Sequence, residues 1–297
     1  MFKSGFVSII GRPNVGKSTF LNAVLQQKIA IMSDKPQTTR NRIQGFFTED
    51  DAQIIFIDTP GIHKPKHKLG EFMVNDAVNS IGGVDLILYL IDVTTPSGPG
   101  EKYILELLAK TKTPVIAVLN KIDTISQKEV DDLLESMERT MLFKEVVAIS
   151  ALNGDNVPVL IERIKYNLPE GPQYYPADQV TDQPEKAIIA EFVREKILTL
   201  TQEEVPHAIA VETESVKEEE GLVKIQCIIY VERESQKGIV IGKNGKVLKE
   251  VGTLARKDIE ELLDSKVFLE LWVKVKKDWR NKDNELRNLG FKKEKNR

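Results

Sequence analysis

Residues 11–18 read GRPNVGKS, and the predicted fold is organised around them. A mostly apolar run at residues 5–10 precedes this stretch, and a run with helical periodicity at residues 17–26 follows it. The stretch matches the phosphate-loop pattern G-x-x-x-x-G-K-[ST] in the strand, loop and helix setting that the pattern requires. Its glycines let backbone N–H groups face a triphosphate at a helix N-terminus. We therefore expect Lys17 to contact the β- and γ-phosphates and Ser18 to ligate Mg²⁺.

The composition is that of an ordinary protein of about two domains. The chain has 297 residues, and its hydrophobic content of 41% is sufficient for normal cores. Its N-terminus lacks a basic start followed by a long apolar run, and the longest apolar run, residues 86–93, is too short to span a bilayer. The single cysteine, Cys227, excludes an intrachain disulfide and a cysteine-based metal cluster. We expect a cytoplasmic, monomeric protein.

Charge is distributed unevenly along the chain. Residues 235–297 contain 17 basic and 10 acidic side chains, whereas residues 178–234 contain 6 basic and 14 acidic ones. A basic final fifth on a protein with a net charge of −3 indicates a localised surface for a polyanion, although a solvated face can have the same composition.

The first 168 residues alternate between strand-length apolar runs and helical patterns. The expected strands are 5–10, 43–48, 53–58, 85–92, 115–119 and 145–149, and the expected helices are 17–26, 70–80, 100–110, 127–140 and 156–167. The continuously apolar run 86–91 is typical of a strand buried on both faces of a parallel sheet. We predict an α/β P-loop domain with a mixed, mostly parallel six-stranded sheet and helices on both faces. Strands 43–48 and 53–58 should pair antiparallel, because the turn between them is too short for a crossover helix.

Residues 169–178, PEGPQYYPAD, contain three prolines and cannot continue a helix. We therefore divide the chain into a first domain at 1–168, a linker at 169–183 and a second domain at 184–297. The elements expected in the second domain are a helix at 184–200, strands at 206–214 and 222–232, a glycine-containing turn, a helix at 246–263, a strand at 267–275 and a terminal helical stretch at 278–289 with a basic tail. Segregated elements of this kind predict a small α+β domain.

Two further motifs lie at predicted carboxyl ends of strands, where a doubly wound sheet binds its ligands. Residues 58–61, DTPG, follow the third strand. Asp58 can hold Mg²⁺ through a water, and Gly61 allows close approach of a γ-phosphate. Residues 120–123, NKID, follow the fifth strand. The Asp123 carboxylate can accept N1–H and the exocyclic amine of guanine, and it would be left unpaired by adenine.

Residues 150–152, SAL, end the sixth strand and can donate a backbone N–H to guanine O6. Each motif alone also fits an ordinary turn or cap, but in this order the motifs resemble the translation-factor class of GTPases. The resemblance implies a first switch loop at 35–42, in which either Thr39, which we favour, or Thr38 closes over Mg²⁺ together with Ser18 and Asp58. The nucleotide-binding residues implied are Gly11, Arg12, Pro13, Asn14, Val15, Gly16, Lys17, Ser18, Thr19, Asp58, Thr59, Pro60, Gly61, Ile62, Asn120, Lys121, Asp123, Ser150, Ala151 and Leu152.

The residue after Gly61 bears on catalysis. Ras-like GTPases carry a glutamine there that orients the attacking water, whereas this chain has Ile62, so we expect slow intrinsic hydrolysis. The chain resembles the branch with a hydrophobic residue at this position, some members of which bind K⁺ partly through a phosphate-loop asparagine that Asn14 matches. Either K⁺ at Asn14 supplies the charge of an arginine finger, or Asn14 only stabilises the loop. The catalytic residues implied are Lys17, Asn14, Thr39 and Gly61.

Residues 242–245, GKNG, lie between an apolar run at 239–241 and an amphipathic helical pattern. A GxxG tetrapeptide alone carries little information, but this setting resembles a type II KH domain, whose GxxG loop clamps the backbone of single-stranded RNA. The alternative is a KH-like fold that binds no RNA. Strand alternation favours a core position for Trp272. The RNA-binding residues implied are Gly242, Lys243, Asn244, Gly245 and Lys246, with Lys274, Lys276, Lys277 and Arg280 as a second basic group.

A GTPase domain with Ile62 after DTPG, followed by a type II KH domain, resembles the Era family of GTPases over nearly the whole chain. The resemblance implies GTP and GDP binding with Mg²⁺, and K⁺ as a candidate second ion. It also implies binding to 16S rRNA near its 3′ end, a role in 30S ribosomal subunit assembly, and a peripheral contact with the membrane. Two alternatives are an RNA-binding assembly module with a vestigial GTPase and a GTPase associated with a membrane or with tRNA modification. The intact Lys17, Ser18, Asp58 and Asp123 argue against the first, and the lack of a recognisable helical or catalytic insertion argues against the second.

Overall fold

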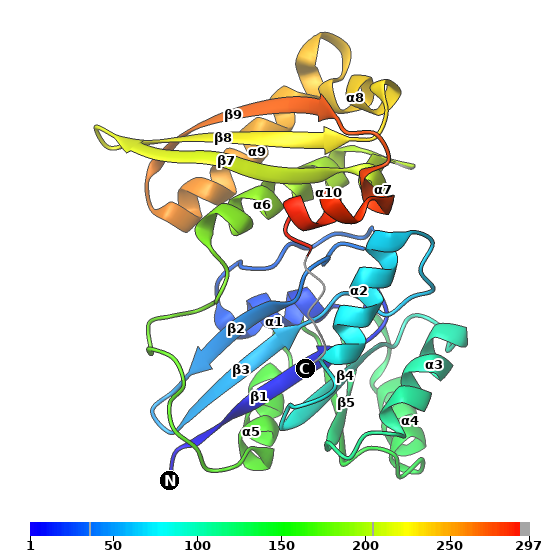
Figure 1. Cartoon of the computed structure of the whole chain (residues 1–297). Coiled ribbons are helices and arrows are strands. Elements are labelled where there is room, and N and C mark those ends of the chain that lie inside the picture. The colour runs from blue at the N-terminus through cyan, green and yellow to red at the C-terminus, as the bar shows by residue number, and fades with distance from the viewer. Residues whose placement is uncertain (36, 204, 292–297) are drawn as a thin grey trace. The chain divides into compact units, whose positions relative to one another are not determined.

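The computed structural model describes residues 1–35, 37–203 and 205–291, which form two compact units (Figure 1). The first unit contains residues 1–30, 37–65 and 73–182, and the second contains residues 31–35, 66–72 and 183–291. Before residue 183, the chain therefore enters the second unit twice and returns to the first. The first of these excursions is residues 31–35, after the phosphate loop, and the second is residues 66–72, after the DTPG motif. The expected basic tail at 292–297 lies outside the described residues.

The sheet of the first unit has the strand order β2-β3-β1-β4-β5-β6. As predicted, β2 pairs antiparallel with β3, while the other neighbouring strands pair parallel. β3 and β5 are buried along their whole lengths and β4 at every residue but Ile91, so their apolar side chains are covered on both faces. The strands are β1 (Lys3–Ile10), β2 (Ile43–Thr48), β3 (Ala52–Asp58), β4 (Leu86–Asp92), β5 (Val115–Asn120) and β6 (Glu145–Ile149).

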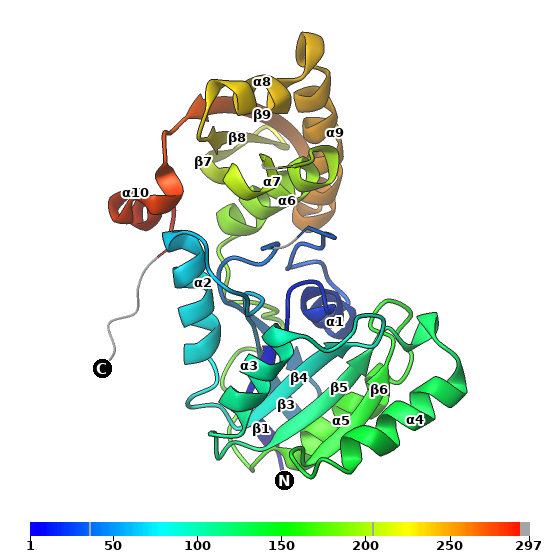
Figure 2. The same cartoon turned by 90° about the vertical axis from the view of Figure 1, so that its right-hand side faces the viewer.

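Helices cover both faces of this sheet, and two of them, α3 and α4, lie toward the viewer in Figure 2. Alternate residues of β4 enter different cores: Leu88 packs in the cluster that includes α1 and α5, and Tyr89 packs in the cluster that includes α2 and α3. This two-sided burial explains the continuous apolar run in β4. The helices are α1 (Lys17–Leu25), α2 (Lys68–Asn79), α3 (Pro99–Leu108), α4 (Gln127–Glu138) and α5 (Val157–Asn167).

The proline-containing segment after α5 packs along the first unit up to residue 182. The ring of Tyr175 stacks on Phe46 with the ring centroids 3.9 Å apart. The Gln53 side chain donates a hydrogen bond to the Tyr175 carbonyl oxygen at 2.9 Å. These contacts hold the expected linker residues in an extended path beside β2 and β3.

The second unit has a sheet in the order β7-β8-β9, in which β8 pairs antiparallel with β7 and parallel with β9. Helices α6 and α9 lie on one face of it (Figure 1). The elements are α6 (Glu185–Leu200), α7 (Val205–Ala208), β7 (Ala210–Glu219), β8 (Leu222–Val231), α8 (Glu234–Ile241), α9 (Lys246–Leu263), β9 (Lys266–Val275) and α10 (Asp283–Asn288), with short 3₁₀ turns at Ile122–Thr124 in the first unit and at Lys243–Gly245 and Trp279–Asn281 in the second.

Three expectations for this unit were wrong. Residues 234–241 form helix α8 instead of a turn, because Gln236 and Val240 are buried on its inner side. The chain before β7 forms the short helix α7 around Pro206, so the strand begins at residue 210 and not at 206. Trp272 lies on the face of β9 that points away from α9 and is 54% exposed, so it is not a core residue.

Two expectations drawn from composition can be placed in the structure. Cys227 is buried in β8, where burial raises the pKa of its thiol to about 11. None of the helices in the described part of the chain combines the length and apolarity that crossing a membrane requires.

Candidate functional site

The register of the first sheet brings the predicted nucleotide motifs to one edge. Ile9 pairs with Asp58, Asp92 pairs with Asn120, and Asn120 pairs with Ile149. Because parallel neighbours end side by side, the loops that follow these strands lie together at the carboxyl edge of the sheet.

The loop between β1 and α1 is closely walled by other segments. A Cβ atom on Gly16, where φ is 98°, would lie 2.2 Å from Asn120 Nδ2. A Cβ atom on Gly11 would lie 2.5 Å from the carbonyl oxygen of Leu90. Asn14, also left-handed at φ 65°, is exposed at the tip of the loop. The neighbouring strands therefore fix the path of this loop and require its glycines.

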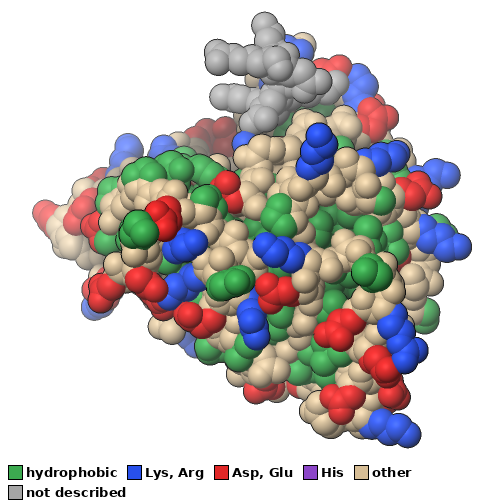
Figure 3. All heavy atoms as spheres, turned by 90° about the horizontal axis from the view of Figure 1, so that it is seen from below, with side chains coloured by type: hydrophobic (Ala, Val, Ile, Leu, Met, Phe, Trp, Pro, Cys, Tyr) green, Lys and Arg blue, Asp and Glu red, His purple; other side chains and the backbone are tan. Residues whose placement is uncertain are grey.

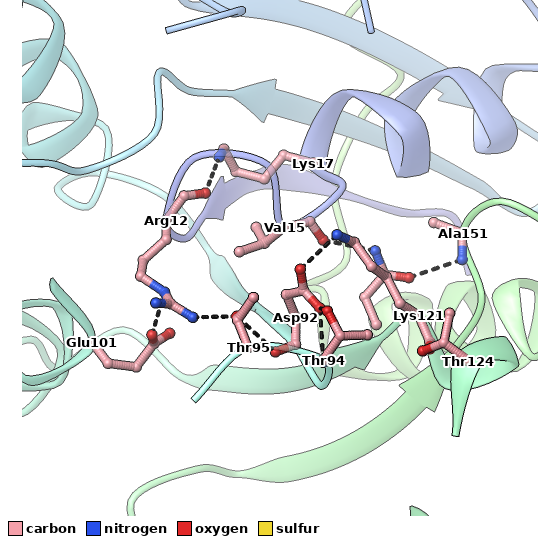
Figure 4. Close-up of polar contacts among 11 residues, drawn as sticks. Arg12, Val15, Lys17, Asp92, Thr94, Thr95, Glu101, Lys121, Thr124 and Ala151 are labelled. Atoms are coloured by element: carbon pink, nitrogen blue, oxygen red, sulfur yellow. Dashed lines mark hydrogen bonds and ion pairs between the residues drawn. The ribbon is translucent and has the colours of Figure 1, made fainter. Parts of the chain in front are cut away.

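The Lys17 side chain is buried at the start of α1, with 6% of its surface exposed. Its ammonium donates a hydrogen bond to the Arg12 carbonyl oxygen at 2.9 Å (Figure 4). Burial lowers the pKa of Lys17 to about 8, and the Asp58 charge partly offsets that effect. A buried cation that donates to backbone carbonyls beside a carboxylate is suited to an anionic ligand.

Three oxygen side chains converge beside Lys17. Ser18 Oγ donates to Asp58 Oδ2 at 2.8 Å and lies 2.9 Å from Thr39 Oγ1, which is itself 3.5 Å from Asp58 Oδ2. Asp58 is fully buried, burial raises its pKa, and its Oδ1 has no hydrogen-bond partner among the described residues. A buried carboxylate with a free oxygen beside two hydroxyls fits a hard divalent cation such as Mg²⁺. Of the two threonine candidates, Thr39 is the one that makes these contacts.

The DTPG segment approaches the phosphate loop through its backbone. A Cβ atom on Gly61 would lie 2.6 Å from Pro13 N, so a larger residue would displace the loop. The Ile62 N–H donates to the Gly11 carbonyl oxygen at 3.2 Å, while the Ile62 side chain is 2% exposed and packs in the core beside α2 and α3. Ile62 therefore presents only its backbone to the site.

Asn120 connects two of the loops. Its Nδ2 donates to the Val15 carbonyl oxygen at 2.8 Å, and its Oδ1 accepts the Ala151 N–H at 2.9 Å (Figure 4). Because Asn120 is 2% exposed, its role is to hold the phosphate loop and the SAL segment together.

The base-recognition residues differ in how they are held. The Lys121 ammonium pairs with Asp92 Oδ2 at 2.5 Å, and the Lys121 backbone is left-handed at φ 72°. Asp123 is exposed at the end of β5 and follows this fixed residue. Ser150 donates its N–H to the Asp155 carbonyl oxygen at 3.0 Å, so this amide is already used within the protein.

The GKNG loop of the second unit precedes α9. Gly242 has φ 72°, and a Cβ atom there would lie 2.5 Å from the Val247 side chain. Gly245 has φ 75°, with no described atom within 4 Å of a Cβ placed there. Lys243, Asn244 and Lys246 are exposed. The backbone therefore needs both glycines, and the loop presents two cations at a helix N-terminus.

A hollow of ≈ 430 Å³ continues from this loop between α9 and the edge strand β9. It combines an apolar floor with cationic side chains, which suits a ligand with flat bases and phosphates. Its lining residues are Gly245, Leu248, Lys249, Gly252, Thr253, Arg256, Phe268, Leu269 and Leu271.

Comparison with known proteins identifies both units. Residues 6–121 match the model of a family described as 50S ribosome-binding GTPase, and residues 204–280 match the KH domain model. A variant of Era from Aquifex aeolicus bound to GDP·AlF₄⁻ is 43% identical, with a TM-score of 0.94, and the match covers 98% of this chain and 99% of that one. Era in complex with MgGDPNP and nucleotides 1506–1542 of 16S ribosomal RNA is also 43% identical over the same shares of both chains, with a TM-score of 0.95.

The chain belongs to the Era family of GTPases. Family membership confirms the predicted fold class, a P-loop GTPase domain followed by a KH domain. The individual site residues remain predictions.

The second basic group is less available than the sequence indicates for an Era protein. Lys276 Nζ lies 2.9 Å from Glu285 and 4.4 Å from the centre of the Tyr230 ring. Arg280 pairs with Glu232 at 2.5 Å. Lys274 and Lys277 are exposed, so of the group they are the two better placed for RNA.

One face of the molecule has no predominance of basic side chains (Figure 3). Figure 3 shows basic and acidic side chains intermixed with hydrophobic ones on the face seen from below in Figure 1. An intermixed face of this kind offers no single-sign field to a polyanion.

Sequence reasoning missed several residues that support the nucleotide site. The Arg12 guanidinium pairs with Glu101 and donates to Thr95 Oγ1 at 2.6 Å (Figure 4), and Tyr89 donates to Glu101 at 2.8 Å. Asp92, the partner of Lys121, ends β4, as Asp58 ends β3. Its place at a strand end was the signal that could have found it, whereas Glu101 lies inside a helix and gives no such signal.

Proposed function

We propose that this chain is a guanine-nucleotide switch that hydrolyses GTP in its first unit and binds small-subunit ribosomal RNA through its second. The observation that carries the proposal is the convergence of Lys17, Ser18 and Asp58 at a loop whose glycines are closely packed against neighbouring strands. The Era relatives support it, since one was solved with GDP·AlF₄⁻ and another with MgGDPNP and 16S rRNA nucleotides 1506–1542.

Ser18, Thr39 and Asp58 are the residues that would hold Mg²⁺, Asp58 through a water. The ion supplies positive charge that offsets the charge on the phosphate oxygens. Lys17 would exchange its bond to the Arg12 carbonyl for stronger, charge-assisted bonds to the β- and γ-phosphates. Close approach of the Gly61 amide would complete the set of donors.

Guanine would be read by the exposed Asp123 carboxylate, which accepts N1–H and the exocyclic amine. The guanine O6 would take its N–H from Ala151, in exchange for the bond to Asn120, or from Leu152. Lys121 is held by Asp92, so its alkyl chain is positioned to cover one face of the base.

The attacking water must be assisted without a side chain from residue 62, because Ile62 is buried. Besides Lys17, the phosphate loop contains one other cationic side chain, Arg12. The guanidinium of Arg12 is held by Glu101 and Thr95. We propose that K⁺, bound partly by the exposed Asn14, supplies this charge. Faster turnover in K⁺ than in Na⁺, lost in Asn14→Ala, is expected; equal rates in the two salts would rule K⁺ out.

RNA would bind the GKNG loop and the adjoining hollow, with phosphates near Lys243, Lys246 and Lys249. The test is a filter-binding series against the 16S rRNA segment matching nucleotides 1506–1542, across salt concentrations. Log affinity should fall with log salt with a slope of about −0.7 for each phosphate neutralised, or roughly −2 for three. A slope near zero, or equal affinity for a DNA of the same sequence, would contradict the assignment.

A role in 30S subunit assembly, a cytoplasmic location and a peripheral contact with the membrane are proposals that rest on membership of the Era family. Depletion of the protein should leave immature small-subunit particles with unprocessed 16S rRNA. Normal subunit profiles after depletion would favour the alternative, a GTPase whose RNA binding serves another RNA.

A further inference from the structure

Glu101 is a buried carboxylate to which the nucleotide chemistry above gives no role. It lies in the first turn of α3 and is 5% exposed. Its Oε1 atom accepts a hydrogen bond from the Tyr89 hydroxyl at 2.8 Å, and its Oε2 atom pairs with Arg12 Nε. Burial of a carboxylate is costly unless the group is paired and hydrogen-bonded, so these two partners offset the cost of placing Glu101 here.

Tyr89 fixes the carboxylate from the sheet. It lies in β4, is fully buried, and is the register partner of Ile10, the last residue of β1 before the phosphate loop. Burial raises the pKa of the Tyr89 hydroxyl, and the neighbouring Glu101 charge raises it further, so the hydroxyl keeps its proton and donates to Glu101. A rigid strand therefore holds the Glu101 carboxylate beside the start of the phosphate loop.

Arg12 connects this carboxylate to the phosphate loop. Its guanidinium also donates to Thr95 Oγ1 at 2.6 Å (Figure 4). A Cβ atom on Gly100 would lie 3.4 Å from Arg12 Cδ, so the start of α3 passes directly beside the Arg12 chain. The segment from β4 to α3 thus holds this side chain along its length, while the Arg12 carbonyl oxygen accepts the Lys17 ammonium inside the loop.

The phosphate loop therefore has an anchor on each half. Asn120 donates to the Val15 carbonyl oxygen and so holds the half next to α1. Glu101, through Arg12, holds the half formed by residues 11–13. The two anchors come from different elements, β5 and α3, and they can be tested separately.

The half at residues 11–13 is the one that contacts the DTPG segment. The Ile62 N–H donates to the Gly11 carbonyl oxygen at 3.2 Å, and a Cβ atom on Gly61 would lie 2.6 Å from Pro13 N. Under the proposed function, the Gly61 amide approaches the γ-phosphate, which GTP has and GDP lacks. A displacement of residues 11–13 should therefore affect GTP and its hydrolysis more than it affects GDP.

We propose that Glu101 is a positioning residue for GTP hydrolysis, which acts through Arg12 to fix residues 11–13 against the DTPG segment and so sets the place of the γ-phosphate. The proposal rests on the GTPase function proposed above. It adds to that function a residue that contacts neither the nucleotide nor Mg²⁺.

The test measures the rate of GTP hydrolysis under single-turnover conditions, together with the affinities for mant-GDP and for a non-hydrolysable mant-GTP analogue. Glu101→Gln keeps the size of the side chain and removes its charge. Small misplacements of reacting groups are costly, so hydrolysis should slow at least about tenfold, analogue affinity should fall about threefold, and GDP affinity should stay within about twofold. Glu106→Gln, at an exposed glutamate of the same helix, should match the unmodified protein.

Two further variants separate positioning from stability. Arg12→Gln leaves Glu101 buried without its cation, so hydrolysis should slow and the unfolding midpoint should fall. Adding Glu101→Gln to Arg12→Gln should restore part of the midpoint but none of the hydrolysis, because the two residues act as one unit. Tyr89→Phe keeps the Arg12–Glu101 pair and the fold, and the loss of one hydrogen bond should slow hydrolysis about threefold.

Unchanged hydrolysis in both Glu101→Gln and Tyr89→Phe would overturn the proposal, even with a lowered midpoint, since the pair would then only stabilise the fold. Faster hydrolysis in Glu101→Gln would also overturn it, because Glu101 would then restrain an arginine that otherwise acts on the γ-phosphate. Equal losses of GDP and analogue affinity would show that the pair holds the whole loop and would overturn it too. If the unmodified protein hydrolyses no GTP, the proposed function fails together with this inference, whereas normal hydrolysis there confines any failure to Glu101.

Discussion

The chain has two glycine loops at the N-termini of helices, and they are built in opposite ways. Around residues 11–18, side chains and backbone from other strands occupy the space beside the glycines, and Lys17 is buried. Around residues 242–245, Gly245 has open space beside it and both lysines are exposed. The first loop is held by its unit, whereas the second is shaped by its own backbone turn.

This difference indicates how each site binds. A buried, walled loop has few solvent-exposed charges to order, so single substitutions should cause large losses that depend little on salt. An exposed loop gains affinity from several phosphate contacts, so single losses should be smaller and strongly salt-dependent. The predictions below test that contrast.

Lys17→Ala should have the largest effect. Losing a buried, charge-assisted donor to two phosphates should weaken GTP binding at least 100-fold, about 3 kcal/mol, and reduce hydrolysis below detection. Isothermal titration with GDP and a phosphate-release assay would measure both. Lys110→Ala, at an exposed lysine of the same unit, should match the unmodified protein. Retained GTP affinity in the first variant would show that the buried loop is not the phosphate site.

Gly242→Asp with Gly245→Asp should weaken RNA binding by more than about 30-fold and leave GTP affinity unchanged. The new carboxylates repel phosphates, and both positions have positive φ. Because a Cβ on Gly242 would press on Val247, the unfolding midpoint should be measured alongside filter binding. A parallel loss of GTP affinity in the absence of RNA would show that the two substitutions disturb the first unit and do not act at the RNA site alone.

Asp92→Asn should weaken GDP binding about tenfold, the effect of losing a charge-assisted hydrogen bond to Lys121. Burial acts against ionisation of Asp92, but hydrogen bonds from Lys121 and Thr94 hold its pKa below the usual range. The ionised Asp92 should therefore stabilise the folded protein fully above the ordinary carboxyl pKa. This contribution to the free energy of unfolding should be lost as pH falls through the lowered pKa. RNA affinity should not change. Unaltered GDP affinity, measured by mant-GDP fluorescence, would show that Lys121 needs no partner.

The smallest effect expected is a pH dependence of nucleotide binding. Since burial lowers the pKa of Lys17 to about 8, nucleotide binding above pH 8 should take up a fraction of a proton, roughly 0.75 at pH 8.5. Calorimetry in two buffers with different ionisation enthalpies would measure this uptake. In the nucleotide-free protein, the unfolded chain binds the extra proton between pH 8 and the ordinary 10.5, so this group's contribution to stability rises with pH in that window. No proton uptake on nucleotide binding above pH 8 would contradict the lowered pKa of Lys17.

The nucleotide residues could be named from the sequence because strand ends and side-chain chemistry constrain them together. Asp58 and Asn120 follow apolar strands, so their positions at the sheet edge follow from the alternation of strands and helices. The antiparallel pairing of β2 and β3 followed from a turn length, and helix 246–263 followed from its apolar periodicity.

The rest depends on contacts between distant segments. The Ile239-Val240-Ile241 run favours a strand or turn by local propensity, and only tertiary burial of Val240 makes it helical. Alternation along β9 correctly separates two faces, but it cannot tell which face a helix covers, and for Trp272 the choice was wrong. The groove beside Phe268 forms only when α9 packs against β9, so no sequence window contains its signal.

The proposal that this chain is a guanine-nucleotide switch requires GTP occupancy of the first loop to change RNA binding at the second. The most direct test is the affinity of one protein preparation for the 16S rRNA segment, measured with a non-hydrolysable GTP analogue and with GDP. The analogue form should bind RNA at least about fivefold more tightly, and by linkage the RNA should tighten analogue binding relative to GDP by the same factor. Equal RNA affinity in the two nucleotide states would contradict the claim.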